Sequence, residues 1–571
     1  MLPDGADAGI GSLVSVPFHG RTVKAWILGP ATDAPAGRLL DIRKVRSDVR
    51  FFDGPMLEVL RWTSGRYLAP LCTVIERSHP PRVASEERLP LPAEQRGVAP
   101  TSAPRRGPAT VLESGAATWV RPLPGEEASE CVRFVSACLA SGRRAIVIVP
   151  EATPLPWTAE SVLEAFGDRT VDFVGGGARK RYRTWLEIQA GRYDVVVGTR
   201  PAVFAPVADL GIIWVSREVH PGHREDRSPY YHVREVALAR ARIQGAACAL
   251  ASLCPSVETA VAIAGGGIGV SRPTRQVERA RAPLVETTPP EAEDRSPRLS
   301  RLLKEVRSAA LIVSRAGYGV ARVCRSCGQP AACAVCRGPI VVEGGAAACR
   351  VCGAPGRCAT CGASDFGIER GGVERIAEWT RRMRPLPVDV ETEGPPARPD
   401  PGRILVGTAA AVNDVPPVDL DLVAILDPDR ALARPGVHAG ERALATWMEA
   451  AAWVGPRERG GRVLVQTRKA GHPAVQGLVR WEPEPFLRSE AAARTEAGFP
   501  PGHPVFRVEG TAGLAEALRA AGGGTVLDTE HENGSLCLVT VPPDRLPEFR
   551  SDVVRLATDG VVARIEAEPQ L

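Results

Sequence analysis

Lysine is scarce in this chain of 571 residues, and arginine supplies nearly all of the positive charge. None of the lysines follows a glycine, so the phosphate-binding loop G-x-x-x-x-G-K-[ST] is absent. Arginine suits phosphate because its planar guanidinium donates two hydrogen bonds at once. A GC-rich genome, which also raises the content of Ala, Gly and Pro, explains the bias equally well. The net charge of +5 therefore favours nucleic acid only weakly. The lysines are Lys24, Lys44, Lys180, Lys304 and Lys469.

Long apolar runs are also missing. The sequence contains no stretch of eighteen apolar residues, and the N-terminal MLPDGADAGIGS has neither a basic start nor an apolar core. These two absences exclude a spanning helix and a secretory signal, so we expect a soluble, cytoplasmic protein with no membrane partner. The length is sufficient for three or four domains, each with its own core.

Histidine is absent from the segment in which the cysteines gather. Eight cysteines form four C-x-x-C pairs between Cys324 and Cys361, so a metal there would have four thiolate ligands. Two C-x-x-C turns complete the tetrahedral shell of one Zn²⁺, and eight thiolates predict two structural zinc ions. Disulfides are the alternative interpretation. Four consecutive C-x-x-C pairs without a secretory signal argue against it.

The gaps between the pairs predict how they combine. These gaps are five, twelve and five residues long. Twelve residues suffice for a hairpin that brings two pairs onto one ion, whereas five residues make a cramped one. The expected inner zinc site is Cys333, Cys336, Cys349 and Cys352, and the outer site, nested around it, is Cys324, Cys327, Cys358 and Cys361. The other cysteines, expected to be buried thiols, are Cys72, Cys131, Cys138, Cys248, Cys254 and Cys537.

Hydrophobic periodicity predicts an α/β protein. Residues 12–29 alternate as a β-hairpin, residues 55–75 have helical spacing, and residues 78–108 have the composition of a linker. Short β-branched runs separated by helical segments then predict parallel sheets covered by helices. The expected strands are 144–150, 193–199, 210–215, 309–313, 403–407, 422–426 and 462–466, with helices such as 130–141 and 232–244. The last ~75 residues are expected to form a small α+β domain.

Several segments carry a more specific signal. They are VSVPFHGR (14–21), VIVPEATPLP (147–156), VVVGTRPAVFAPVADLGIIWV (195–215), VSRAGYGVARVCRSCG (313–328), RILVGTAAAVNDV (403–415) and GFPP (498–501). Together with the cysteine spacing, the most specific of these signals, they make nearly the whole chain resemble the replication restart (PriA, primosomal protein N′) family of superfamily 2 DNA helicases. The resemblance implies the same nested pairing of the zinc ligands.

The resemblance implies an α/β fold with two superfamily 2 helicase-like (RecA-like) parallel-sheet lobes. It adds an inserted all-cysteine double zinc module and small N-terminal β-rich and C-terminal α+β domains. The expected ranges are an N-terminal DNA-binding-like domain at 1–82, a Pro/Arg linker at 83–110, lobe one at 111–270, the start of lobe two at 271–322, the zinc module at 323–362, the rest of lobe two at 363–490 and the C-terminal domain at 491–571.

The parts of this family that handle ATP and Mg²⁺ are missing. Where its phosphate-binding loop belongs the chain reads RPLPGEEASECV (121–132), and we align Ala128 with the lysine, beside Glu126 and Glu127. The acidic D-E-x-H box is replaced by SREVH (216–220), which retains only Glu218 and His220, and Arg217 stands in place of an acid. The arginine motif of lobe two is absent from 448–461, although Arg457 and Arg459 lie there. Each loss removes part of the phosphoryl-transfer machinery, so we expect neither ATP hydrolysis nor strand unwinding.

Two further departures concern DNA. The winged-helix domain of the family is missing, and its first N-terminal strand, which helps to hold a primer 3′ end, is not found ahead of Gly11. Either the start site is drawn too late or the 3′-end pocket is compromised. Candidate phosphate contacts follow Gly175–Gly177, although a solvated basic helix is the simpler interpretation. These candidates are Arg179, Lys180, Arg181 and Arg183.

Other single residues are weaker candidates. His220, His223 and His232 lie close together in the sequence, but with Glu218 they match no known metal-site spacing, and we expect no metal there. Trp119 and Trp214 are expected to fill cores.

The resemblance implies a role in replication restart, with branched or single-stranded DNA at forks as the ligand. Implied partners are primosome proteins, the replicative helicase and its loader, and single-strand binding protein, which would place the chain at the nucleoid. Two alternatives stay open. One is an ATP-dependent 3′-to-5′ helicase with an unrecognised nucleotide site, and the other is a protein-binding scaffold without DNA affinity.

Overall fold

The computed structural model describes most of the chain. The described residues are 7–31, 40–91, 115–290, 296–314, 321–327, 331–336, 338, 340–343, 346–349, 352–369, 372–383, 385–391, 399–434, 436–531 and 534–569. Residues 92–110 of the expected linker lie outside them. Within the described residues, no helix is long and apolar enough to cross a membrane.

The N-terminal part is a small antiparallel sheet followed by helices. The expected hairpin forms from β1 (Ser12–Phe18) and β2 (Arg21–Trp26), and β3 (Lys44–Arg50) pairs with the other side of β1. The stretch of helical spacing over 55–75 is helical but forms two helices, α1 (Gly54–Tyr67) and α2 (Leu71–Arg77). Leu68 ends α1 in the left-handed conformation with φ 51°, and Pro70, which has no N–H to donate, precedes α2.

The next part, which we call the first lobe, is a seven-stranded sheet with its helices. All of its strand pairs are parallel, and the order is β10-β4-β9-β8-β5-β7-β6. The central strands are buried on both faces, as expected for β-branched runs between helical layers. The elements are β4 (Ala117–Val120), α3 (Glu127–Ala140), β5 (Arg144–Ile148), α4 (Trp157–Phe166), β6 (Thr170–Phe173), α5 (Ala178–Gln189), β7 (Val195–Gly198), β8 (Leu210–Val215), α6 (Val233–Gln244), β9 (Ala247–Ala251), α7 (Val257–Ala264) and β10 (Gly269–Ser271).

A second parallel sheet, the core of what we call the second lobe, has six strands in the order β11-β20-β19-β12-β18-β17. Helix α8 (Arg275–Arg281) connects the two lobes along the chain. The elements of the second lobe are β11 (Leu284–Thr288), α9 (Pro297–Glu305), β12 (Ala309–Val313), α10 (Gly372–Met383), β17 (Val388–Val390), β18 (Ile404–Gly407), β19 (Leu422–Leu426), α11 (Pro428–Leu432), α12 (Ala439–Ala451), β20 (Arg462–Gln466), α13 (Pro473–Arg480) and α14 (Glu484–Glu496).

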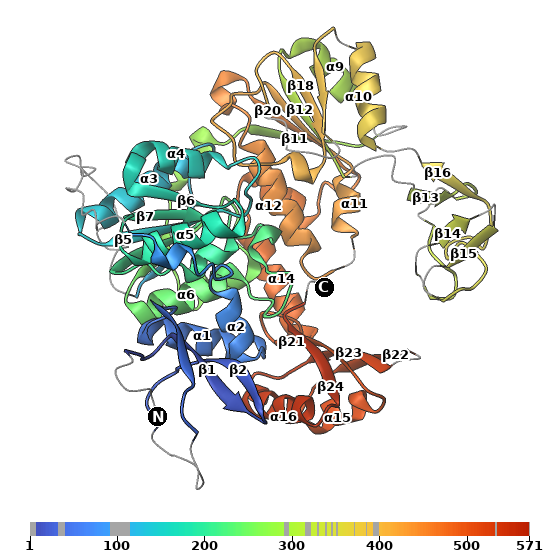
Figure 1. Ribbon diagram of the computed structural model, residues 1–571. Helices are drawn as coiled ribbons and strands as arrows, with labels where there is room; N and C mark the ends of the chain where they lie inside the picture. Colours follow the sequence, from blue (N-terminus) through green and yellow to red (C-terminus); the bar gives the residue numbers. More distant parts are fainter. Residues whose placement is uncertain are drawn as a thin grey trace.

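The cysteine-rich segment interrupts the second lobe between β12 and α10. Its described residues form two short antiparallel pairs, β13 (Ala321–Cys324) with β16 (Phe366–Glu369), and β14 (Ile340–Glu343) with β15 (Ala346–Cys349). Figure 1 shows these strands standing out to one side of the second lobe, away from the first lobe and from the N-terminal part. The segment therefore builds its structure largely from its own residues.

The C-terminal part is a four-stranded antiparallel sheet in the order β22-β23-β21-β24. It lies beside the N-terminal helices at the base of the first lobe, where α1 contacts β24 (Figure 1). Arg224 of the first lobe pairs with Glu566 at 2.9 Å. The elements are β21 (Val505–Gly510), α15 (Leu514–Ala520), β22 (Val526–His531), β23 (Gly534–Thr540), α16 (Leu546–Thr558) and β24 (Val562–Ala567).

Side chains outside the cysteine pairs mostly follow the predicted burial. Trp119 and Trp214 are fully buried, as expected. Among the scattered cysteines the prediction of burial is wrong for Cys72, which is exposed because it lies on the second position of the short amphipathic helix α2. The other five are buried.

Candidate metal centres and the interlobe junction

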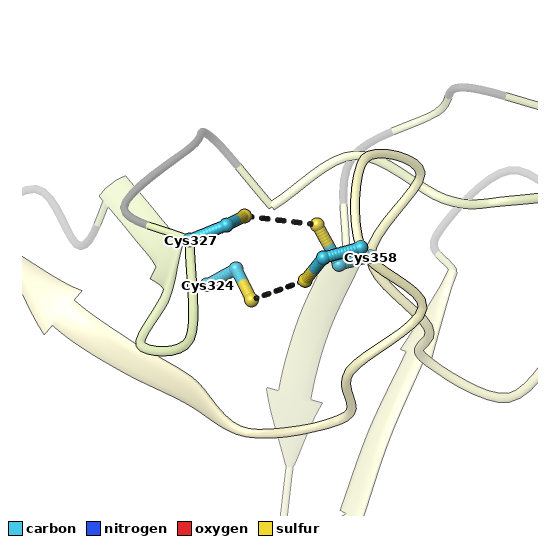
Figure 2. A group of neighbouring side chains, drawn as sticks. Cys324, Cys327 and Cys358 are labelled. Carbon is cyan, nitrogen blue, oxygen red and sulfur yellow. Dashed lines mark hydrogen bonds between the residues drawn. The ribbon is translucent and has the colours of Figure 1, made fainter.

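The first candidate metal centre brings together the two outer C-x-x-C pairs. The sulfur atoms of Cys324 and Cys361 lie 3.4 Å apart, and those of Cys327 and Cys358 lie 3.7 Å apart. Figure 2 shows the sulfurs converging from two loops that are distant in the sequence. Cys324 ends strand β13, so its antiparallel partner β16 fixes the distance between the two loops. All four sulfurs lie within 4.8 Å of one another.

The second candidate centre brings together the inner pairs. The sulfur atoms of Cys333 and Cys352 are 3.8 Å apart, and those of Cys336 and Cys349 are 3.4 Å apart. The β14–β15 pair joins the two C-x-x-C loops, as expected for a gap of twelve residues. The two centres also touch each other, because Cys333 and Cys358 form an isolated antiparallel bridge.

The donor set of both centres fits zinc. A tetrahedron of Zn–S bonds of roughly 2.3 Å has sulfur–sulfur edges of roughly 3.8 Å, and the distances between the sulfurs are 3.4–3.8 Å. Backbone N–H groups donate to three of the sulfurs at 3.3–3.4 Å, which stabilises the thiolate that a metal requires. Four thiolates would fill the tetrahedral shell and leave no position for a reactive water, so such an ion would be structural.

The segment aligned with the phosphate-binding loop points into the junction between the two lobes. Ala128 is buried on α3, and Glu127 is the first residue of that helix. The Glu127 carboxyl accepts hydrogen bonds from the Ser216 hydroxyl and, at 3.3 Å, from the backbone N–H of Arg217. Burial, with Asp414 nearby, raises the pKa of Glu127 to about 8. A carboxyl group with a raised pKa therefore lies next to Ala128, the residue that we align with the phosphate-binding lysine.

Arg217, which stands where the acidic box would place an acid, crosses the same junction. Its guanidinium contacts the Glu449 carboxylate of α12 and donates to the Val412 carbonyl at 2.8 Å. On the first-lobe side it lies 3.9 Å from Glu151. These carboxylates raise the pKa of Arg217 against the opposing effect of burial, so it is always charged. The position of a metal-binding acid thus holds a permanent cation.

The remaining acidic-box residues are engaged in other contacts. Glu218 is fully buried, accepts from the Ser256 backbone N–H at 2.6 Å and pairs with Arg234 at 3.2 Å. His220 lies 3.2 Å from Glu151 and accepts from the backbone of Gly222 at 3.0 Å. Within the described residues, the groups of four cysteines are the only clusters with metal-binding geometry, and the histidine cluster is not among them.

Two residues of the junction carry no sequence signal that we recognised. Asp414 follows β18, and its carboxylate accepts the backbone N–H of Thr158 across the junction at 2.7 Å. Glu449 lies in the last turn of α12. Their distinguishing feature is that several carboxyl groups surround one arginine. This feature exists only in the folded protein, where the two lobes meet. Arg459 instead pairs with Asp419 at 2.8 Å on the surface.

Two neighbouring cavities lie at the junction, and the larger, of about 210 Å³, is lined by Gly125, Pro417 and Arg459 among other residues. A cavity of about 60 Å³ lies between Glu127, Arg217, Asp414 and Glu449. Pockets that bury small-molecule ligands typically enclose about 300–1,000 Å³. Each of the two cavities is smaller than this range.

The basic candidates on α5 divide into two pairs. Arg179 contacts Glu86, and Arg183 pairs with Glu187 at 3.0 Å and donates to the Pro90 carbonyl at 2.6 Å. These two hold the segment after α2, including the first residues of the expected linker, against the first lobe. Lys180 and Arg181 are exposed and form no ion pair with any residue that the structure describes.

Comparison with known proteins identifies the lineage. A family profile for the PriA 3′DNA-binding domain (3′BD) matches residues 1–80. A Mycobacterium tuberculosis protein named "Probable replication restart protein PriA" is 32% identical over 555 residues, which cover 90% of this chain and 84% of that protein. The chain belongs to the PriA family.

More distant PriA proteins match as well. The "Replication restart protein PriA" of Treponema pallidum is 28% identical over 542 residues, covering 87% of this chain and 81% of that protein. The Bacillus subtilis protein of the same name is 25% identical over 401 residues, covering 65% and 50%. The two parallel-sheet lobes are thus the helicase-like lobes of a PriA protein, with the 3′ DNA-binding domain formed by the N-terminal sheet and helices.

Proposed function

We propose that this PriA-family protein recognises DNA at abandoned or stalled replication forks and helps to assemble the primosome, without hydrolysing ATP itself. The proposal that the protein does not hydrolyse ATP rests on the contacts at the interlobe junction. Ala128, which we align with the phosphate-binding lysine, is buried beside Glu127, and Arg217 stands where we align a magnesium-binding acid. The Glu127 carboxyl accepts from Ser216 of its own lobe, and Arg217 contacts Val412 and Glu449 of the other lobe. A motor that needs three parts of one phosphoryl-transfer site is not expected to work without them.

The DNA-binding half rests on family membership and on the matched 3′ DNA-binding domain. Branched DNA with a free 3′ end and single-stranded DNA are the ligands that follow from these two findings. The partners would be primosome proteins, single-strand binding protein, and the replicative helicase with its loader. Such a role places the protein on the chromosome, in the cytoplasm.

Two zinc ions per chain complete the proposal, with the eight cysteines of the two candidate centres as ligands. Their sulfur spacing and backbone N–H donors support this assignment. The zinc module would present a fixed surface to the DNA branch or to a partner protein. It would take no chemical part in the reaction, because four thiolates fill the coordination shell.

Phosphate release is the experiment that tests the motor-less half. The zinc-loaded protein is mixed with ATP and Mg²⁺, with and without a fork whose leading strand ends in a 3′-OH at the junction. We expect no fork-stimulated release and no strand displacement. Release that rises in proportion to both protein and fork would overturn the proposal in favour of a helicase with an unrecognised nucleotide site.

Fork binding in the same samples tests the other half. We expect the fork with a 3′ end at its junction to bind more tightly than a fork that lacks the leading strand. Absence of binding to either fork would support the protein-binding scaffold instead.

A further inference from the structure

We propose that Arg217 and Glu449 form a latch that holds the two lobes in one closed arrangement, at the position where a nucleotide would otherwise join them. The inference deepens the proposed function, which requires only that ATP is not used. It adds that the two lobes do not open and close during the work of the protein.

The contacts of Arg217 show how the latch is built. The guanidinium leaves the first lobe after β8 and reaches both the α12 side chain of Glu449 and the backbone carbonyl of Val412 at 2.8 Å. Its side chain is 6% exposed and that of Glu449 is 18% exposed, so water screens the pair poorly. One arginine therefore ties two separate segments of the second lobe to the first.

The backbone of Arg217 gives an independent indication. Its φ is 48°, in the left-handed region that residues with a side chain rarely adopt. Such a conformation persists where the surrounding contacts fix it, and it is common where a side chain must be aimed at a particular partner. The contacts that fix it here come from both lobes.

The charges of the junction favour a cation at position 217. Four carboxyl groups face this space, Glu127 and Glu151 from the first lobe and Asp414 and Glu449 from the second. His220 lies 3.2 Å from Glu151, and Arg217 interacts with all four carboxyl groups. If that cation were removed, carboxyl groups of the two lobes would face each other without compensation, which is unfavourable at low dielectric.

Further contacts hold the lobes in the same arrangement. The backbone N–H groups of Trp157 and Thr158 donate to Asp414, at 3.1 Å and 2.7 Å. Arg121, which is 1% exposed, donates to the Trp481 carbonyl of the second lobe at 2.9 Å. These groups meet directly, so a movement that separated the lobes would break several buried polar contacts together.

A latch of this kind has a consequence for DNA. In a helicase the lobes change their relative position as nucleotide binds and leaves, which moves the DNA strand. With the lobes held closed, the surface that they present to a fork keeps one geometry. This suits a platform that recognises a fork and waits for a partner.

Hydrogen–deuterium exchange of the full-length, zinc-loaded protein tests the latch. The variants are Arg217→Met, the milder Glu449→Gln, and the exchanged pair Arg217→Glu with Glu449→Arg. Arg382→Met, which breaks a surface ion pair with Glu378 on α10, is the matched control. We expect peptides spanning 212–218, 408–416 and 446–454 to exchange about tenfold faster in Arg217→Met. A smaller increase is expected in Glu449→Gln, partial recovery in the exchanged pair, and no change in the control.

The outcomes separate the latch from the proposed function. Exchange at wild-type rates in both Arg217→Met and Glu449→Gln would overturn the latch, even if ATP is never hydrolysed. Exchange that changes when ATP and Mg²⁺ are added to the wild type would overturn the closed arrangement, and it would also count against the motor-less function. If Arg217→Met fails to fold, Glu449→Gln and the exchanged pair decide the question.

Discussion

The guanidinium of Arg217 contacts the carboxylate of Glu449 across the junction of the two parallel-sheet lobes. The two lobes meet here at the segments that we align with a nucleotide site, and this contact joins them directly. The relationship explains how three losses in the sequence fit together. Arg217 has partners in the other lobe, and Glu127 accepts hydrogen bonds from Ser216 and Arg217 of its own lobe.

The first prediction concerns pH. The pKa of Glu127 is raised from 4.5 to about 8 by burial and by Asp414, while Arg217 and the Ser216 hydroxyl oppose the shift. Between these two pH values the folded protein keeps a proton that the unfolded chain has lost, so stability falls as pH rises from 4.5 to 8. Glu127→Gln removes this part of the slope. We expect the melting temperature of Glu127→Gln minus that of the wild type to increase by a few °C from pH 5 to pH 8.5.

Other groups of the junction titrate in the same direction, because burial also raises the pKa of Asp414. Glu127→Gln should therefore flatten the pH profile only in part. Parallel profiles of the variant and the wild type would show that Glu127 is ionised throughout and would contradict the buried protonated carboxyl.

The second prediction concerns zinc. Cys358→Ser is expected to remove the outer ion and Cys349→Ser the inner one, so that each variant holds about half of the metal measured in the wild type. Elemental analysis of the purified proteins measures this directly. Cys72→Ser, which alters an exposed cysteine outside the module, should keep the full metal content. Loss of both ions in either variant would show that the two centres fold as one unit.

The third prediction concerns the backbone of the 3′ DNA-binding domain. Gly11 has φ 85°, and a Cβ there would lie 2.0 Å from the Phe52 carbonyl oxygen. Gly11→Ala is therefore expected to destabilise this domain by about 1–3 kcal/mol. Gly65→Ala on α1 is the matched control, because its Cβ would meet nothing within 4 Å. Alanine at that helical position is expected to stabilise by about 0.5–1 kcal/mol.

The stability of both glycine variants is measured by thermal unfolding and by limited proteolysis of the full-length protein. The cleavage sites that report on this domain are those within residues 7–91. The expected result is opposite signs for the two substitutions. Equal stability of Gly11→Ala and the wild type would mean that the β1–β3 sheet can move away from Phe52 at no cost.

The fourth prediction concerns phosphate contacts on α5. Reversing the two exposed cations, Lys180→Glu with Arg181→Glu, is expected to weaken DNA binding in a way that does not depend on sequence. It should also reduce the slope of log K against log salt by about two. Reversal of Arg301 and Lys304 on α9 serves as the control of equal charge. An unchanged slope would mean that Lys180 and Arg181 face solvent and do not contact DNA phosphates.

The sequence predicted the cysteine groups and seven of the parallel strands, for physical reasons that are local, but it missed the interior strands β4 and β9. Runs such as Leu210–Val215 are β-branched and fully buried, so their pattern is unambiguous. The cysteine groups followed from chain length, since twelve residues form the β14–β15 hairpin and five do not. Edge strands such as β10 and β11 were not expected, because they are short and partly exposed and their composition does not mark them as strands.

The interlobe junction was the part that the sequence could not predict. The sequence shows that the lysine and the acidic box are lost. It does not show which contacts the residues in their places make. Asp414 and Glu449 lie about 200 and 230 residues beyond Arg217, and only the packing of one lobe on the other brings their carboxylates to it. The break after α1 was missed because helical spacing continues through it, whereas Leu68 and Pro70 end one helix and begin the next.

The central claim is fork recognition without a motor, and one titration tests it most directly. The zinc-loaded protein is titrated onto fork DNA and onto a linear duplex of equal charge, at one fixed salt concentration, with and without ATP and Mg²⁺. The salt must be fixed because phosphate contacts make affinity depend steeply on it. The account predicts tighter binding to the fork and identical curves with and without ATP. Fork affinity that shifts with ATP, or equal affinity for the fork and the duplex, would contradict it.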